Sequence, residues 1–190
     1  MDSKVSGALD DILGSNNSSI VKTNTNGELF LKVFFRKKVK NYQLSKLDNY
    51  EEERNFPGLD QTSYLSPHLR FGIVSIRTIV TKSLSNKSFL SELIWREFFM
   101  QIIYHFPKVI HSNFKQKYDS IKWRNNLDEF KSWKTGNTGY PIIDAGMREL
   151  NETGYMHNRV RMLVAGFLCK HLLIDWRWGE AFFAKKLLDY

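Results

Sequence analysis

The chain has 190 residues, of which 42% are hydrophobic, so it can bury a core, and general disorder is excluded. Its net charge of +8 favours a polyanionic partner, nucleic acid first and an anionic membrane surface second. Many soluble proteins are basic without such a partner, so charge alone does not decide. Cys169 is the single cysteine, which excludes an internal disulfide.

The remaining composition argues against a metal site and a membrane segment. The five histidines show no HExxH spacing, and there are no paired cysteines, so no metal site is predicted. The longest apolar run, residues 162–169, is far too short to span a bilayer. The N-terminus has early acidic residues and no apolar core of signal-peptide length, so we expect a cytoplasmic protein. No obligate protein partner is indicated.

Residues 1–47 have the composition of a linker with one hairpin. Asn26 and Gly27 lie between two strand-like stretches, residues 19–22 and 29–35, which predicts a β-hairpin with a type I′ turn. A basic cluster follows, and a solvated charge run explains it as well as a nucleic-acid patch does. The cluster comprises Arg36, Lys37, Lys38 and Lys40.

From about residue 48 onward the pattern is helical. Residues 61–69 are rich in hydroxyl groups, with Ser66 suited to an N-cap and Pro67 to the first helical position. A helix start preceded by hydroxyl groups is suited to binding a phosphate, and a capped helix without a ligand gives the same pattern. The sequence therefore leaves both interpretations open here.

Residues 89–104 form the next predicted helix. Its expected apolar set is Leu93, Ile94, Phe98, Ile102 and Ile103. A second face at spacing i, i+3, i+4, i+7 carries Glu92, Trp95, Arg96 and Phe99. A carboxylate, an indole and a guanidinium on one stripe suggest a binding face. A structural pair between Glu92 and Arg96 with Trp95 packed beside it is the alternative.

Pro141 predicts the start of another helix, and residues 154–162 (GYMHNRVRM) the start of a third. Asn158, Arg161 and Met162 share one helical face, which could read a polar, anionic, partly aromatic ligand. A solvated first turn is the alternative. We expect this helix to run to about Asp175, residues 176–179 to break it, and a last helix to cover residues 180–188.

Five motifs in this order resemble the photolyase/cryptochrome family. They are TSYLSPHL (62–69), ELIWREFF (92–99), TGYPIIDAGMR (138–148), MHNRVRM (156–162) and LIDWR (173–177). The resemblance covers residues 50–190 and implies a mainly α fold, the helical FAD-binding domain of that family, after a short N-terminal hairpin or linker. Asn158 with Arg161 and Met162 is similar to the class I cyclobutane pyrimidine dimer photolyases.

The resemblance implies light-driven DNA repair. In the family a reduced FAD passes an electron to a pyrimidine dimer that is flipped out of UV-damaged DNA, and the cyclobutane ring splits. The cofactor-binding positions implied are Tyr50, Thr62, Ser63, Tyr64, Leu65, Ser66, Phe89, Arg96 and Arg161. The dimer-handling, catalytic positions are Glu92, Trp95, Asn158 and Met162. The DNA-binding positions are Arg54, Glu92, Trp95, Phe99, Asn158 and Arg159, and Trp123 and Trp176 match members of an electron-transfer chain.

The sequence also departs from the family's pattern at some positions. Phe89 stands where many relatives have tryptophan, and Gln61 replaces a common glycine. Residues 1–47 are expected to follow a missing antenna domain, and residues 48–190 to form a flavin domain incomplete at its C-terminus. We therefore expect the chain alone to hold FAD weakly and to be inactive, with a second antenna chromophore only in a full-length protein. A cryptochrome-like photoreceptor and a non-catalytic DNA-binding remnant are the alternative functions.

Overall fold

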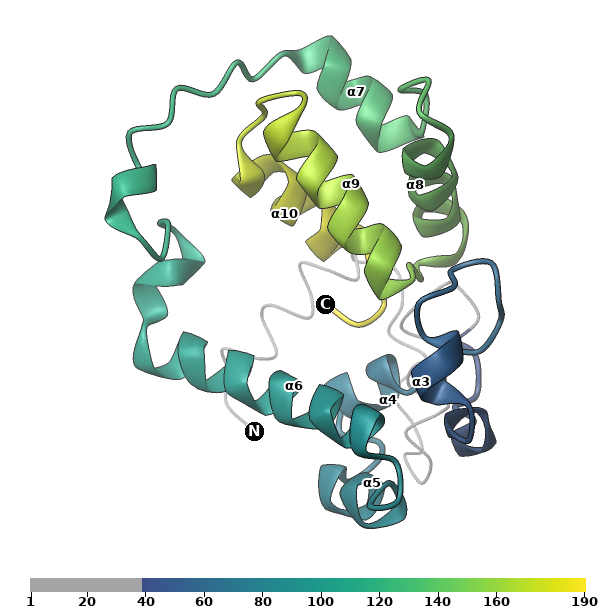
Figure 1. Ribbon diagram of the computed structural model, residues 1–190. Helices are drawn as coiled ribbons and strands as arrows, with labels where there is room; N and C mark the ends of the chain where they lie inside the picture. The colour runs from purple at the N-terminus through teal and green to yellow at the C-terminus, as the bar shows by residue number, and fades with distance from the viewer. Residues whose placement is uncertain (1–38) are drawn as a thin grey trace, which may run out of the picture. The chain divides into compact units, whose positions relative to one another are not determined.

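A computed structural model of the chain describes residues 39–190 (Figure 1). The predicted hairpin and most of the basic cluster lie outside the described residues. Within residues 39–190 the fold is helical without strands, so the mainly α prediction is confirmed. The elements are η1 (Leu44–Leu47), α3 (Tyr50–Glu53), α4 (Ser66–Arg70), α5 (Ile76–Lys82), α6 (Lys87–His105), η2 (Pro107–Ile110), η3 (Gln116–Tyr118), α7 (Leu127–Thr135), α8 (Pro141–Thr153), α9 (Asn158–Lys170) and α10 (Trp176–Lys186).

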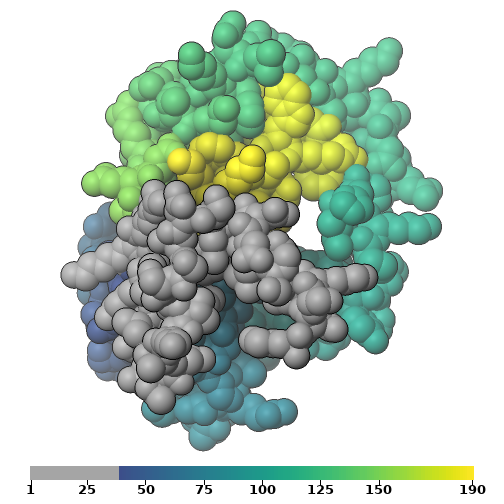
Figure 2. Space-filling view, turned by 180° about the vertical axis from the view of Figure 1, so that it is seen from behind, coloured from purple at the N-terminus to yellow at the C-terminus, as the bar shows by residue number. Residues whose placement is uncertain are grey.

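The larger core is built by α7, α8, α9 and α10, which lie together in Figure 1. Trp133 of α7 is fully buried, and its indole Nε1 donates a hydrogen bond to the Val164 carbonyl oxygen at 3.0 Å. Its ring lies 5.7 Å from Phe182 and 5.5 Å from Phe183 on α10. In Figure 2, seen from behind, the yellow surface of the C-terminal residues adjoins the green surface of the segment that contains α7 and α8.

Two glycines shape the path of the chain between α8 and α9. A Cβ atom at Gly146 would lie 2.3 Å from Cγ1 of Val160, so the absence of a side chain lets the two helices approach closely. Gly154 ends α8 in the left-handed region at φ 77°, where glycine is favoured, and its amide donates to the Leu150 carbonyl oxygen at 2.9 Å. The chain can therefore turn directly from α8 into the stretch that starts α9.

A second, smaller core lies at the N-terminal side of the described chain. It gathers Leu47, Leu65, Ile79, Phe89 and Leu93. Asn86 caps α6 by accepting a hydrogen bond from the Phe89 amide at 2.9 Å, so α6 begins two residues earlier than predicted. This core holds α6 beside α3 and the hydroxyl-rich residues 61–66.

The predicted apolar face of α6 is only partly correct. Leu93 is buried together with Phe89, but Ile94, Phe98 and Ile103 are exposed by 46–63%. The helix is apolar around most of its circumference, so spacing alone could not tell which side meets the core. No helix among residues 39–190 combines the length and apolar character needed to cross a membrane.

Three predicted helix boundaries are wrong. Helix α9 ends at Lys170, not near Asp175, and α10 begins at Trp176, inside the predicted break. Leu173 adopts a left-handed φ of 51°, and the Asp175 carboxylate caps α10 by accepting from the Arg177 amide at 3.0 Å. Ser66 is the first residue of α4 rather than its N-cap, which is Leu65 and makes no side-chain capping bond.

The loop between α7 and α8 is closed by one buried carboxylate. Asp144 accepts hydrogen bonds from the Thr138 amide (2.7 Å), the Thr138 hydroxyl (2.6 Å) and the Gly139 amide (2.9 Å). Burial by itself would raise the pKa of Asp144, but these hydrogen bonds outweigh it and the pKa lies below its ordinary value.

We expect Asp144→Asn to lower the free energy of unfolding by about 2 kcal/mol at neutral pH, since hydrogen bonds to a charged group are lost. The folded-state pKa is lowered, so this stabilisation is present above the unfolded pKa of about 3.9 and disappears as the pH falls through the folded value. Urea melts at several pH values measure it. The control is Asp128→Asn, at an exposed position of α7. A difference between wild type and Asp144→Asn that stays constant into strong acid would contradict this assignment.

Candidate functional site

The main cavity has a volume of about 520 Å³ and is lined by segments far apart in the sequence. Its walls come from residues 57–66, the start of α3, the end of α8, the start of α9 and the C-terminal Asp189. A neighbouring cavity of about 310 Å³ shares part of this lining and extends to Glu92 and Arg96. The shared residues are Ser63, Leu65, Ser66, Phe89 and Asp189. Eight of the nine predicted cofactor residues thus line the main cavity, and the ninth, Arg96, lines the smaller one.

One wall consists of the hydroxyl-rich loop. Thr62, Ser63 and Ser66 line the cavity, and the Leu65 amide donates to the Ser63 hydroxyl at 3.4 Å. Tyr64 has a left-handed φ of 53°, which is strained for a residue with a side chain. Its hydroxyl donates to Asp60 and accepts from Lys40 Nζ at 2.6 Å, and these bonds stabilise the loop. The loop presents several hydroxyl groups to one space.

Tyr50 and Phe89 form an aromatic wall of the same cavity. The Tyr50 ring meets the Phe89 ring edge to face, with centroids 5.2 Å apart. Burial raises the pKa of Tyr50, and the neighbouring Glu92 adds to this rise. The guanidinium of Arg54 lies 5.6 Å from the centre of the Tyr50 ring. Phe89, which stands where many relatives have tryptophan, therefore still places an aromatic ring against Tyr50.

Arg161 brings a guanidinium into the cavity from α9. Its Nη2 donates to both oxygens of Asp189, at 3.2 and 3.3 Å, and to the Met156 carbonyl oxygen at 3.4 Å. Its Nε is buried and has no hydrogen-bond partner among the described residues. A buried donor without a partner is unfavourable, so this atom suits a polar ligand atom.

An ion pair joins the end of α3 to α6 beside the smaller cavity. Arg54 Nη1 donates to Glu92 Oε1 at 2.6 Å, and both side chains are partly buried. The expected alternative, a pair between Glu92 and Arg96 within α6, is not the one formed. Arg54 and Glu92 were predicted as separate ligand contacts, and the structure brings them together. This pairing fixes the direction of the Glu92 carboxylate.

Trp95 and Phe99 continue the face of α6 that begins at Glu92. Their rings are stacked with centroids 5.9 Å apart and an interplanar angle of 29°. Trp95 is 52% exposed and Phe99 59% exposed, so both present aromatic surface to solvent. An exposed aromatic stack beside a carboxylate is suited to holding a planar base.

The first turn of α9 carries the remaining predicted contacts. Asn158 is exposed, as is Met162. Arg159 Nε donates to Asn55 Oδ1 at 3.0 Å, which ties α9 to the end of α3. His157 caps the helix by accepting from the Arg159 amide at 3.2 Å. Burial and the nearby Arg159 lower the pKa of His157, so it is neutral at pH 7.

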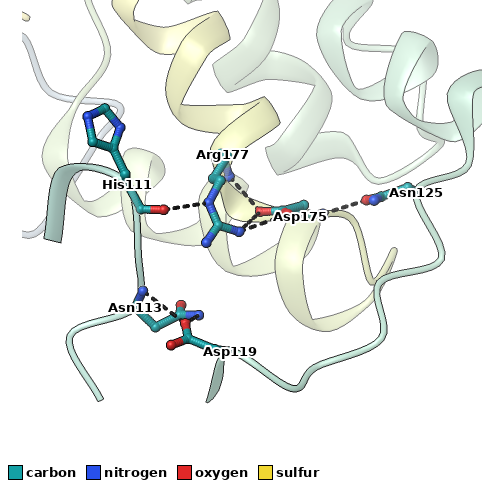
Figure 3. A network of polar contacts seen from close by, with 6 residues as sticks. All are labelled: His111, Asn113, Asp119, Asn125, Asp175 and Arg177. Carbon is teal, nitrogen blue, oxygen red and sulfur yellow. Dashed lines mark hydrogen bonds and ion pairs between the residues drawn. The ribbon is translucent and has the colours of Figure 1, made fainter. Parts of the chain in front are cut away.

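The two predicted electron-transfer tryptophans lie on adjoining segments. The Arg124 amide donates to the Leu173 carbonyl oxygen at 2.8 Å, and the Asp175 amide donates to Asn125 Oδ1 at 2.8 Å. Figure 3 shows how Arg177 extends this network, donating to Asp175 and to the His111 carbonyl oxygen at 3.0 Å. Trp123 and Trp176 stand next to these paired residues, and both are partly buried.

Sequence reasoning missed several residues of the cavity. Lys40, Tyr155, His157 and Asp189 line it but were not predicted as site residues. His157 was within a quoted motif and could have been included. In the sequence, Lys40 is only one member of a basic cluster. Asp189 lies 28 residues after Arg161, with which it pairs. Their roles depend on contacts between distant segments.

The hydroxyl loop, the aromatic wall and the unpaired guanidinium Nε define a helical domain with a cavity for a large, polar, partly aromatic ligand. The profile of the FAD binding domain of DNA photolyase matches residues 89–190. The chain belongs to the photolyase/cryptochrome family, whose helical domain binds FAD.

Several known proteins are similar to this chain in sequence and structure. The deoxyribodipyrimidine photo-lyase of Agrobacterium fabrum is 48% identical over 152 residues, which cover 75% of this chain and 32% of that protein. A bacterial class III photolyase from Agrobacterium tumefaciens superposes with a TM-score of 0.72 at 48% identity, covering 76% of this chain and 32% of that one. A cryptochrome from Synechocystis superposes with a TM-score of 0.69 at 38% identity, covering 77% of this chain and 32% of that one. The chain spans about a third of the length of these relatives.

Proposed function

We propose that this chain forms part of a deoxyribodipyrimidine photo-lyase, a lyase that uses FAD and light to split cyclobutane pyrimidine dimers in DNA. The observation that carries the proposal is the shared face of Glu92, Trp95 and Phe99, which begins beside the cofactor cavity. An exposed aromatic stack with a fixed carboxylate suits two covalently linked, neighbouring pyrimidines of one strand that have left the duplex.

The cavity fits FAD on its own chemistry. Thr62, Ser63 and Ser66 offer hydroxyl donors for phosphate oxygens, and Tyr50 with Phe89 offers apolar ring surface. The partnerless Nε of Arg161 offers a further donor. When bound, FAD supplies the light-driven electron; the residues of the chain bind and orient the two reaction partners and keep water away.

The dimer-facing residues have separate tasks. Trp95 and Phe99 stack on the flipped bases, and Glu92 hydrogen-bonds them where negative charge develops. Arg54 orients Glu92 through the 2.6 Å contact. Asn158, Arg159 and Met162 border the same region from α9, with Arg159 placed to meet a DNA phosphate. Trp123 and Trp176 carry electrons toward the cofactor. The partner of the enzyme is UV-damaged DNA, and the enzyme acts in the cytoplasm.

The test uses the protein expressed from its complete coding sequence and an oligonucleotide with one thymine dimer. Dimer loss under blue light is followed by chromatography, with a dark sample and an undamaged oligonucleotide as references. Glu92→Gln should lower repair per absorbed photon by at least about tenfold and change dimer binding far less, because its hydrogen bond matters most as charge develops. Glu97→Gln, an exposed α6 position, is the matched control and should leave both quantities unchanged.

Three other outcomes would overturn the proposal. A protein that binds FAD and responds to light without losing dimers would be a photoreceptor. One that binds DNA without dimer preference and without FAD would be a non-catalytic DNA-binding protein. Equal losses of repair in Glu92→Gln and Glu97→Gln would remove Glu92 from the site.

A further inference from the structure

Lys40 is held against the cavity by its backbone as well as its side chain. Its amide donates to the Tyr155 hydroxyl at 3.0 Å, and its carbonyl oxygen lies 3.0 Å from Nε2 of His68, a residue that is 2% exposed. The preceding residue, Val39, is buried. Both polar backbone groups of Lys40 therefore have partners in distant parts of the chain, which keeps this lysine at the rim.

The ammonium group of Lys40 reaches the hydroxyl loop. Nζ donates to the Tyr64 hydroxyl at 2.6 Å and lies 4.1 Å from the centre of the Tyr64 ring. The loop residues Thr62, Ser63 and Ser66 line the same cavity. The hydrogen bond with Tyr64 is the main reason that the pKa of Lys40 is raised above its ordinary value. The Lys40 ammonium group is therefore charged at neutral pH.

The other basic side chains that line the cavity are paired or neutral. Arg161 is paired with Asp189, and His157 is neutral because burial and Arg159 lower its pKa. Asp60 is shared by the Tyr64 hydroxyl and by Lys46, whose Nζ lies 3.4 Å from a carboxylate oxygen. Glu149 faces the cavity as well, and Lys40 counteracts the rise of its pKa that burial causes. Lys40 is thus the cavity-lining cation whose direct hydrogen-bond partner is a neutral hydroxyl.

From this geometry we propose that Lys40 is a cofactor-binding residue that contacts the diphosphate of a dinucleotide in the cavity. This inference rests on the proposed function in one respect, namely that the bound cofactor is a dinucleotide. A diphosphate carries two negative charges that the hydroxyl groups of the loop cannot balance, and an ammonium group forms charge-assisted hydrogen bonds with such oxygens. On ligand binding, Lys40 exchanges the Tyr64 hydroxyl for a phosphate oxygen.

The test compares three ligands, FAD, ADP and riboflavin, by calorimetric titration of the protein expressed from its complete coding sequence. Lys40→Met should weaken FAD and ADP binding by about tenfold or more, since a charge-assisted hydrogen bond is lost. Riboflavin lacks phosphate, so its affinity should change less than about twofold by the same reasoning. Lys40→Arg retains the charge and should recover most of the ADP affinity.

Lys131→Met, an exposed position on α7, removes the same charge away from the cavity and should leave all three affinities unchanged. A melting curve for each variant shows that the fold is retained, which we expect because the backbone bonds of Lys40 do not need its side chain.

An equal loss for riboflavin and ADP, an unchanged ADP affinity, or an unmodified protein that binds neither ADP nor FAD would overturn the assignment. A failure of light-driven repair with the ADP effect intact would count against the proposed function alone.

Discussion

Replacing Trp133 with alanine should lower the free energy of unfolding by about 4 kcal/mol, the largest effect of any single substitution considered for this chain. The indole is fully buried, stacks on Phe130 at 5.8 Å, and donates to the Val164 carbonyl oxygen. Alanine leaves a cavity between α7, α9 and α10 and a buried carbonyl without its donor. Denaturant unfolding followed by circular dichroism measures the loss.

The matched control is the same substitution at Trp95. Trp95 is 52% exposed, so Trp95→Ala should change the free energy of unfolding by less than about 1 kcal/mol. It should instead weaken binding of dimer-containing DNA by about 1–3 kcal/mol, because a stacking surface is lost. A large stability loss at Trp95, or none at Trp133, would show that the two rings have been assigned to the wrong environments.

The second large effect is expected at Gly146. Gly146→Ala places a Cβ atom 2.3 Å from Cγ1 of Val160 and forces α8 and α9 apart, which should lower the free energy of unfolding by about 3 kcal/mol. For a domain of this size that corresponds to a fall in the melting temperature of roughly 6–12 °C. Differential scanning calorimetry measures it.

Gly166 in α9 is the matched control, because a Cβ atom there would meet no atom within 4 Å. Gly166→Ala should raise the free energy of unfolding by about 0.5–1 kcal/mol, since alanine favours the helix. If both alanine variants were stabilised, the close approach of α8 and α9 would not exist.

Helices with local start and stop signals were predictable from the sequence. Pro141 begins α8 as expected, because proline fixes φ, and Gly154 ends it, because glycine accepts the left-handed conformation. The boundary between α9 and α10 was not predictable in this way. It depends on Leu173 in a left-handed conformation, and on the hydrogen bonds that Arg124 and Asn125 contribute from 50 residues away.

For the candidate site, the motifs named residues that the structure brings together, but they did not give the pairings. Tyr50, the hydroxyl loop and Arg161 line one cavity, and their role in binding a cofactor stays a prediction. Helical spacing favoured Arg96 as the partner of Glu92, whereas Arg54, 38 residues upstream, is the observed partner. Periodicity reports which residues share a face of one helix, and it carries no information about which other segment packs against that face.

The bond from the Lys40 amide to the Tyr155 hydroxyl, which spans 115 residues, also bears on the order in which the molecule assembles. Helices α7 to α10 contact their neighbours in the sequence, and Trp133 of α7 also contacts Phe182 and Phe183 of α10. Their core therefore closes shorter loops than the contact between residues 40 and 155 does. Joining residue 40 to residue 155 closes a much longer loop, and this entropy cost must be met before the contact stabilises anything. We therefore expect the cavity to be completed late in folding, so that a chain whose C-terminal core has already formed still lacks the side of the cavity that Lys40 provides.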